Sequence, residues 1–115
     1  MIKDPRVFLQ HIRDSILDIE TYTKDVTLTS FLTSANKVKQ DAVVRRIEII
    51  GEATRNMPED FKKGHPEIAW VEISNMRNKL IHEYFGVDLE LVWEVVKKDI
   101  PQLKTHVEEI LKIMI

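Results

Sequence analysis

The residues best suited to chemistry lie together in one short stretch, residues 76–88. Arg77 is a permanent cation whose planar fork of donors fits phosphate oxygens, and Asn78 beside it can donate or accept hydrogen bonds. An unperturbed histidine has a pKa of about 6.5, so a residue of the type of His82 can take up or release a proton near neutral pH. Tyr84 adds a hydroxyl group that could be modified. This stretch therefore predicts anion binding combined with proton transfer.

The rest of the chain offers few reactive groups. It contains no cysteine, which excludes disulfides, thiolate metal sites and cysteine nucleophiles. No two histidines have the spacing of metal ligands, and no glycine-rich phosphate loop is present. We therefore predict no metal site and no cofactor. The formal net charge of −2 over 115 residues provides no global basic field that would attract nucleic acid.

Helical patterns must position the reactive stretch. Asp4 followed by Pro5 is typical of a helix start, and apolar residues then recur at helical spacing to about residue 23. A loop with one short turn precedes a second predicted helix over residues 34–56. Gly51 lies on its apolar stripe, which predicts close approach by another helix because glycine costs ~1 kcal/mol there relative to alanine.

The second half of the chain continues the helical pattern after a break over residues 58–66, which has room for one turn. A third predicted helix covers residues 69–83 and is ended by Gly86. Asp88 then caps a last helical segment, which Pro101 should kink. No convincing strand appears. The sequence predicts a single domain, residues 1–115, of all-α class: an antiparallel bundle of four to five helices.

A helical wheel over the third predicted helix separates the reactive residues. Arg77 falls inside its apolar arc, whereas Asn78 and His82 fall on the polar side as neighbours four residues apart. Arg77 and His82 lie about 140° apart around the axis, so one ideal helix does not aim both at a small target. A loosened helix end near Gly86 would bring them together. So would a two-fold homodimer with this helix in each copy facing the other, which we favour. The second helix carries an extra apolar strip that either a dimer or another helix of the same chain could cover: Ala42, Ile49 and Ala53.

Simpler interpretations of the same residues remain open. A lone histidine on a polar helix face is most often only solvated. Arg77 can be the cationic half of a structural ion pair, with Glu48 or Glu52 as candidate partner, because an unpaired buried guanidinium costs several kcal/mol.

The spacing of an arginine, a histidine after four intervening residues, and a tyrosine two positions later resembles the signature of HEPN-domain proteins. More closely, the chain resembles the HepT-like family of ribonuclease toxins. The similarity extends through residues 45–53, 68–70, 77–84 and 92–101 in that order.

The resemblance implies a homodimeric HEPN fold that acts as a metal-independent endoribonuclease on RNA. Arg77, Asn78 and His82 would be its catalytic residues, with Glu48 and Glu52 as candidate supporting residues. In that family the toxin is commonly paired with a nucleotidyltransferase antitoxin of the MNT type, which adds AMP to the motif tyrosine. By position that tyrosine is Tyr84, and its modification would place bulk and negative charge near the site.

Two other functional classes stay open. The chain can be a non-catalytic module in which the same helix binds a nucleotide or a nucleotidyltransferase partner, or a structural helical adaptor. No uncharged apolar run approaches membrane-spanning length, and the charged N-terminal residues are incompatible with a secretory signal. We therefore expect a cytoplasmic protein without a membrane segment.

Overall fold

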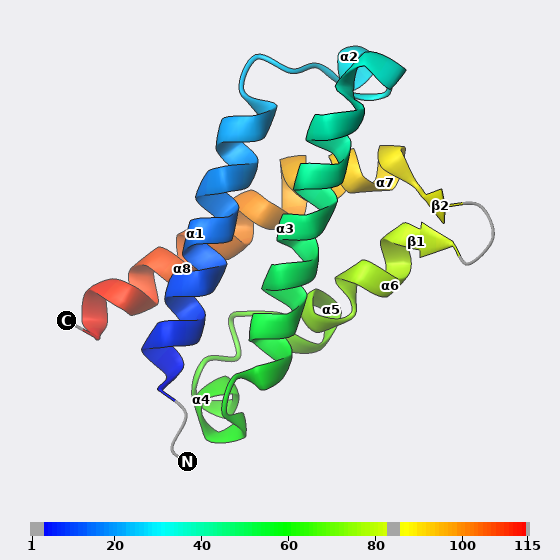
Figure 1. Cartoon of the computed structure of the whole chain (residues 1–115). Helices are drawn as coiled ribbons and strands as arrows, with labels where there is room; N and C mark the ends of the chain where they lie inside the picture. The colour runs from blue at the N-terminus through cyan, green and yellow to red at the C-terminus, as the bar shows by residue number, and fades with distance from the viewer. Residues whose placement is uncertain (1–3, 83–85, 115) are drawn as a thin grey trace.

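The computed structural model describes residues 4–82 and 86–114, with residues 81 and 82 described by their backbone alone. The first long helix, α1 (Pro5–Thr23), begins as predicted, since the Asp4 side chain accepts a hydrogen bond from the Arg6 N–H at 2.9 Å. The second, α3 (Lys37–Asn56), runs antiparallel beside it (Figure 1).

The link between these helices contains α2 (Leu28–Phe31) and the 3₁₀ turn η1 (Ser34–Asn36). The buried side chain of Gln40 donates from Nε2 to the carbonyl of Phe31 at 2.7 Å and thereby ties α3 to this link. The regular helix therefore begins after the 3₁₀ turn, and not at residue 34 as the sequence suggested.

The break after α3 contains one short helix, α4 (Glu59–Gly64). The ring of Phe61 lies 4.5 Å from that of His65, centroid to centroid. The indole N–H of Trp70 donates to the His65 carbonyl at 3.0 Å. These contacts fix the loop that leads into the reactive stretch.

The sequence predicted one continuous helix over residues 69–83, and this prediction is wrong. The segment is divided into α5 (Trp70–Ser74) and α6 (Met76–Leu80), with Asn75 between them. The Ser74 hydroxyl donates to a carbonyl one turn earlier at 2.9 Å. The N–H of Asn78 bonds the Asn75 carbonyl at 3.0 Å in a tighter, 3₁₀-type turn. Serine and asparagine side chains compete with helical hydrogen bonds in this way.

A short hairpin follows α6, which corrects the expectation that the chain has no strands. Its strands, β1 (Ile81–His82) and β2 (Gly86–Val87), pair antiparallel with His82 opposite Gly86. Gly86 has φ +78°, a conformation that other residues rarely adopt. Gly86 therefore belongs to a strand of the hairpin and does not end a helix.

The last helical segment consists of α7 (Leu89–Glu94), the π-helical turn η2 (Val95–Asp99) and α8 (Ile100–Ile113). Asp88 caps α7 as predicted, because its Oδ1 accepts an N–H of the first turn at 3.1 Å. Pro101 lies in the first turn of α8, directly after the π turn. Proline has no backbone N–H, so it cannot donate the hydrogen bond to the preceding turn that an α-helix needs. The helix is irregular at this point, with a π turn directly before the proline.

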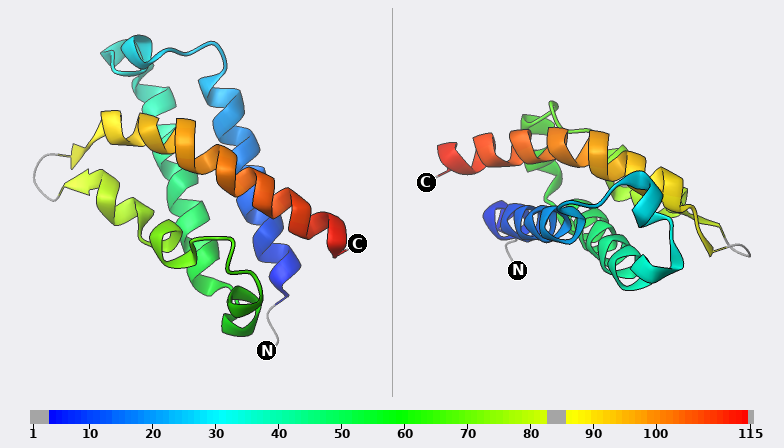
Figure 2. Two further views of the ribbon diagram at one scale, coloured as in Figure 1. Left: turned by 180° about the vertical axis from the view of Figure 1, so that it is seen from behind. Right: turned by 90° about the horizontal axis from the view of Figure 1, so that it is seen from above.

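The helices form two layers, with α1 and α3 in one and the segments α5–α6 and α7–α8 in the other (Figure 2). The all-α bundle is confirmed, with the small hairpin as an addition. Between the layers lies one apolar core. No helix in the described ranges is both long and apolar enough to cross a membrane. The most deeply buried core side chains are Leu9, Ile12, Ile16, Ile19, Phe31, Val43, Ile47, Ile50, Leu80, Val92 and Val107.

Candidate active site

Arg77 lies on the surface of α6 and is bonded to α3. Its Nε donates to Glu48 Oε2 at 2.8 Å. The Arg77 side chain is 50% exposed and that of Glu48 27% exposed. The apolar side predicted by the helical wheel is confirmed, since Ile73, Met76 and Leu80 are buried. Arg77 departs from it, because its side chain extends to the surface and pairs with a carboxylate. Of the two partners predicted for Arg77, Glu48 forms the ion pair, and the exposed Glu52 one turn later forms none with it among the described residues.

The Arg77 pair leaves part of the guanidinium available. Only Nε is bonded to Glu48, and the two terminal nitrogens have no hydrogen-bond partner in the described part of the chain. A guanidinium carries donors on all three of its nitrogens. One edge of Arg77 is therefore fixed while its outer nitrogens can meet an anion.

The other motif residues follow Arg77 closely in the chain. Asn78 is exposed on α6. His82 comes directly after the helix, in β1, so the predicted helical neighbourhood of Asn78 and His82 does not form. The helix already ends at Leu80, and the His82 side chain lies outside the described part of the structure, so the way in which Arg77 and His82 meet stays a prediction. Tyr84 lies outside the described residues, and so does the part of the hairpin that joins the strands.

The face of α3 that contains Gly51 holds the junction between α5 and α6 in place. A Cβ atom at Gly51 would lie 3.4 Å from the carbonyl oxygens of both Ile73 and Ser74, which confirms the predicted close approach. Arg55, one turn further along α3, donates from Nη2 to the Ser74 carbonyl at 3.2 Å. Together with Glu48, these residues contact the junction from one face of α3.

Sequence reasoning missed Arg55. The available signal was its spacing: it lies four residues after Gly51 and seven after Glu48, and therefore on the same helical face. It satisfies a carbonyl that the end of α5 leaves without an intrahelical donor.

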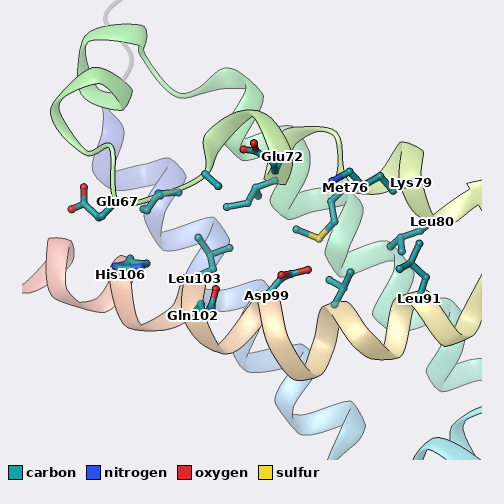
Figure 3. Close-up of a pocket in the computed structure, with 14 residues that line it drawn as sticks. Glu67, Glu72, Met76, Lys79, Leu80, Leu91, Asp99, Gln102, Leu103 and His106 are labelled. Carbon is teal, nitrogen blue, oxygen red and sulfur yellow. The ribbon is translucent and has the colours of Figure 1, made fainter.

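A groove of about 380 Å³ lies between α5–α6 and η2–α8, bordered on one side by α6 (Figure 3). Met76, Lys79 and Leu80 of α6 contribute to it. The same short helix thus connects two features: Arg77 bonded to α3, and this groove. In the described ranges no group of three or more histidine or acidic side chains could hold a metal ion.

Glu67, at one end of the groove, has a perturbed carboxyl group. A hydrogen bond from its own backbone N–H lowers the pKa of Glu67, and a further bond with His65, with Nδ1 3.4 Å from Oε2, lowers it too. The side chain is largely exposed, so solvent screens these interactions. Glu67 therefore remains a carboxylate at neutral pH.

Comparison with known proteins identifies the family of this chain. A family profile described as "Ribonuclease HepT-like" matches residues 12–110. The chain belongs to the HepT-like ribonuclease family. The resemblance of the Arg77–His82 spacing and its flanking helices is thereby confirmed at the level of the family.

Several known proteins match along nearly the whole chain. A "gamma-glutamylcyclotransferase and putative RNase" of Methanocaldococcus jannaschii is 59% identical over 114 residues, which is 99% of this chain. The chain spans only 49% of that relative's length. A "probable ribonuclease HepT" of Thermococcus cleftensis is 46% identical over 112 residues, covering 97% of this chain and 100% of the relative. A "putative RNase" of Caldanaerobacter subterraneus is 41% identical over 111 residues, or 96% and 97% of the two chains. No solved structure matches the chain.

Proposed function

We propose that this HepT-like chain is a metal-independent endoribonuclease, the toxin of a pair whose antitoxin is a nucleotidyltransferase of the MNT type, acting in the cytoplasm. Membership of the ribonuclease HepT-like family over residues 12–110 supports the reaction class. The observation that carries the site is the half-exposed Arg77, bonded at Nε to Glu48 while its terminal nitrogens face no described partner. That is the arrangement expected of a guanidinium held ready for a phosphate.

In the proposed reaction the RNA 2′-hydroxyl attacks the adjacent phosphorus. A bond forms between phosphorus and the 2′ oxygen, the bond to the 5′ oxygen breaks, and the products are a 2′,3′-cyclic phosphate and a 5′-hydroxyl. His82 takes the proton from the 2′-hydroxyl or supplies one to the leaving oxygen. Arg77 stabilises the extra negative charge on the phosphate, and Asn78 contacts a phosphate oxygen or holds the imidazole. These roles need side chains alone, which supports independence from metal.

A two-fold homodimer would complete the proposed site. One copy of the motif supplies one histidine, His82, whereas the reaction needs a base and an acid. A second copy of the motif across a cleft would supply the other. The antitoxin would transfer AMP from ATP to the Tyr84 hydroxyl, releasing pyrophosphate. The attached phosphate would then compete with RNA for Arg77.

The direct test is cleavage of a mixed RNA pool in excess EDTA by wild type, His82→Ala and His11→Ala, purified identically. His11 is an exposed histidine of α1 outside the motif, so its variant controls for loss of any imidazole. We expect cleavage by wild type and His11→Ala and none by His82→Ala. Equal cleavage by His82→Ala would remove this histidine from the reaction.

A second candidate function has one observation in its favour. The Arg77–Glu48 ion pair already neutralises the guanidinium, as in a module where the helix binds a nucleotide or a nucleotidyltransferase without catalysis. That function predicts nucleotide or partner binding that Arg77→Ala weakens, with no RNA cleavage by unmodified wild type.

A further inference from the structure

A second arginine is fixed at the junction between α5 and α6 in the same way as Arg77. Arg55 is exposed on α3, and its Nη2 donates to the Ser74 carbonyl at 3.2 Å. Its Nε and Nη1 have no hydrogen-bond partner in the described part of the chain. Like Arg77, Arg55 therefore has one nitrogen bonded within the protein and other donors that can meet an anion.

Both arginines lie along the seam where α3 packs on α5 and α6 (Figure 1). Glu48, the partner of Arg77, is seven residues before Arg55 on α3, which is two turns or ~10 Å along the axis at almost the same rotation. Gly51, where the carbonyls of the junction come close to α3, lies between them. The two guanidinium groups therefore form a row along this seam.

Arg55 brings more free charge to the seam than Arg77 does. Glu48 is bonded to Arg77 and neutralises it in part. Arg55 is bonded to a neutral carbonyl. The exposed Glu52, three residues before Arg55, forms no ion pair with either arginine within the described ranges. The charge of Arg55 is therefore not neutralised by a bonded carboxylate.

An RNA strand offers such a row more than one anion, because it carries one phosphate per nucleotide. A strand whose reacting phosphate lies at Arg77 continues past it with further phosphates. Proteins hold single strands with cationic side chains that follow the backbone, and phosphate contacts of this kind fix the register of the strand. An arginine anchored two turns along the seam is placed for a neighbouring phosphate.

We propose that Arg55 binds a non-scissile phosphate of the RNA and thereby fixes the register of the strand at Arg77. This inference rests on the proposed nuclease function. Arg55 would act in binding alone, with no part in proton transfer or in stabilising the reacting phosphate. Its loss should therefore weaken RNA binding and raise KM, with kcat little changed.

Variants at Arg55 separate this role from a purely structural one, since Arg55 also bonds Ser74. Arg55→Gln keeps an amide donor for that carbonyl but removes the charge, and Arg55→Lys keeps both a donor and the charge. The control is Arg13→Gln. Arg13 is also an exposed arginine with one partner, since its Nε lies 3.7 Å from Glu108 Oε1, but it lies between α1 and α8. Urea denaturation of each variant reports whether the junction is destabilised.

Binding of a short single-stranded RNA is measured by fluorescence anisotropy in excess EDTA, with a 2′-deoxy nucleotide at the cleavage position to prevent turnover. We expect about fivefold weaker binding by Arg55→Gln at low salt, binding near the wild-type value by Arg55→Lys, and little change in Arg13→Gln. Each phosphate contact to a single strand contributes about 0.7 to the slope of log K against the logarithm of salt concentration. The slope should therefore fall by about 0.7 in Arg55→Gln.

A second substitution, made in the RNA, identifies the phosphate. A single methylphosphonate, which removes one charge, is placed in turn at the scissile phosphate and at the phosphates on either side of it. At the phosphate bound by Arg55, the methylphosphonate should weaken binding by wild type about fivefold and leave binding by Arg55→Gln unchanged. A purely structural role of Arg55 would not produce this coupling.

The outcomes separate this inference from the proposed function. Cleavage by wild type with unchanged RNA binding by Arg55→Gln would overturn the inference alone. So would equal weakening in Arg13→Gln, a loss of kcat and stability at unchanged KM, or coupling of Arg55 to the scissile phosphate. Absence of both cleavage and RNA binding in wild type would instead remove the proposed function, and this inference with it.

Discussion

The ion pair between Arg77 and Glu48 is the contact on which the proposed site depends, so breaking it is the most informative perturbation. The Nε–Oε2 distance is 2.8 Å, and the two side chains are 50% and 27% exposed. Buried pairs cost about 3–5 kcal/mol when one partner is removed, whereas exposed pairs contribute about 0–1 kcal/mol. Because solvent screens this half-exposed pair, we expect a coupling of about 0.5–1 kcal/mol, equivalent to a few degrees in melting temperature for a chain of this size.

The coupling is measured by a double-mutant cycle with Arg77→Ala, Glu48→Ala and the double variant in urea denaturation. The ion pair between Lys37 and Asp41, both on α3, serves as the control. Its Nζ–Oδ2 distance is 3.3 Å, but its two side chains are 74% and 67% exposed. Pairs of that kind contribute about 0.3 kcal/mol. A coupling for Arg77–Glu48 no larger than that of the control pair would refute the argument that Glu48 fixes Arg77.

Activity separates the positioning role of Glu48 from simple charge neutralisation. If Glu48 orients Arg77, Glu48→Ala should lower kcat by about tenfold, equivalent to ~1.4 kcal/mol in the transition state, with little change in KM. Glu48→Gln keeps an acceptor for Nε and should retain most of the activity. Faster cleavage by both variants would mean that the carboxylate merely opposes RNA.

Three further predictions concern stability. Gly51→Ala should stay within about 1 kcal/mol of wild type, because the gain in helix propensity offsets a Cβ placed 3.4 Å from two carbonyl oxygens. Gly51→Val should lose at least about 2 kcal/mol in urea denaturation, and equal stability of the two variants would contradict the close approach. The hydrogen bond with Glu20 raises the pKa of Lys104 above 10.5, so its stabilisation is present below that pH and is lost as pH rises through the folded-state pKa. The melting-temperature difference between wild type and Glu20→Gln should therefore shrink above about pH 10.5. Backbone and His65 hydrogen bonds lower the pKa of Glu67 below 4.5, so its stabilisation is present above pH 4.5 and is lost as pH falls through the folded-state pKa. On acidification below pH 4.5, the melting temperature of Glu67→Gln should therefore fall by less than that of the wild type.

Local signals in the sequence predicted the long helices well. Asp4 and Pro5 mark the start of α1, and the stripe that includes Gly51 identified both the buried face of α3 and its contact with another helix. These features depend on residues within one or two turns of each other, which is why a single sequence is enough to recognise them.

The region of the candidate site was predicted less well. The division at Asn75 depends on α3, because Arg55 bonds the last carbonyl of α5 and Gly51 leaves space for it. The hairpin depends on the conformation of Gly86, which also fits a helix end. The wheel placed Arg77 within the apolar arc, and its side chain nevertheless lies on the surface because it reaches Glu48 of α3, a contact that periodicity alone does not define. The catalytic roles of Arg77, Asn78 and His82, the modification of Tyr84 and the homodimer stay predictions.

The measurement that tests the central claim most directly is the chemistry of the cleaved ends. A defined RNA is incubated with wild type in excess EDTA, in parallel with the same RNA carrying a single 2′-deoxy nucleotide at the cleavage position. Attack by the 2′-hydroxyl predicts a 2′,3′-cyclic phosphate and a 5′-hydroxyl from the first substrate, no cleavage at the deoxy position, and neither product with Arg77→Ala or His82→Ala. Cleavage at the deoxy position, or ends with a 5′-phosphate, would contradict the proposed reaction.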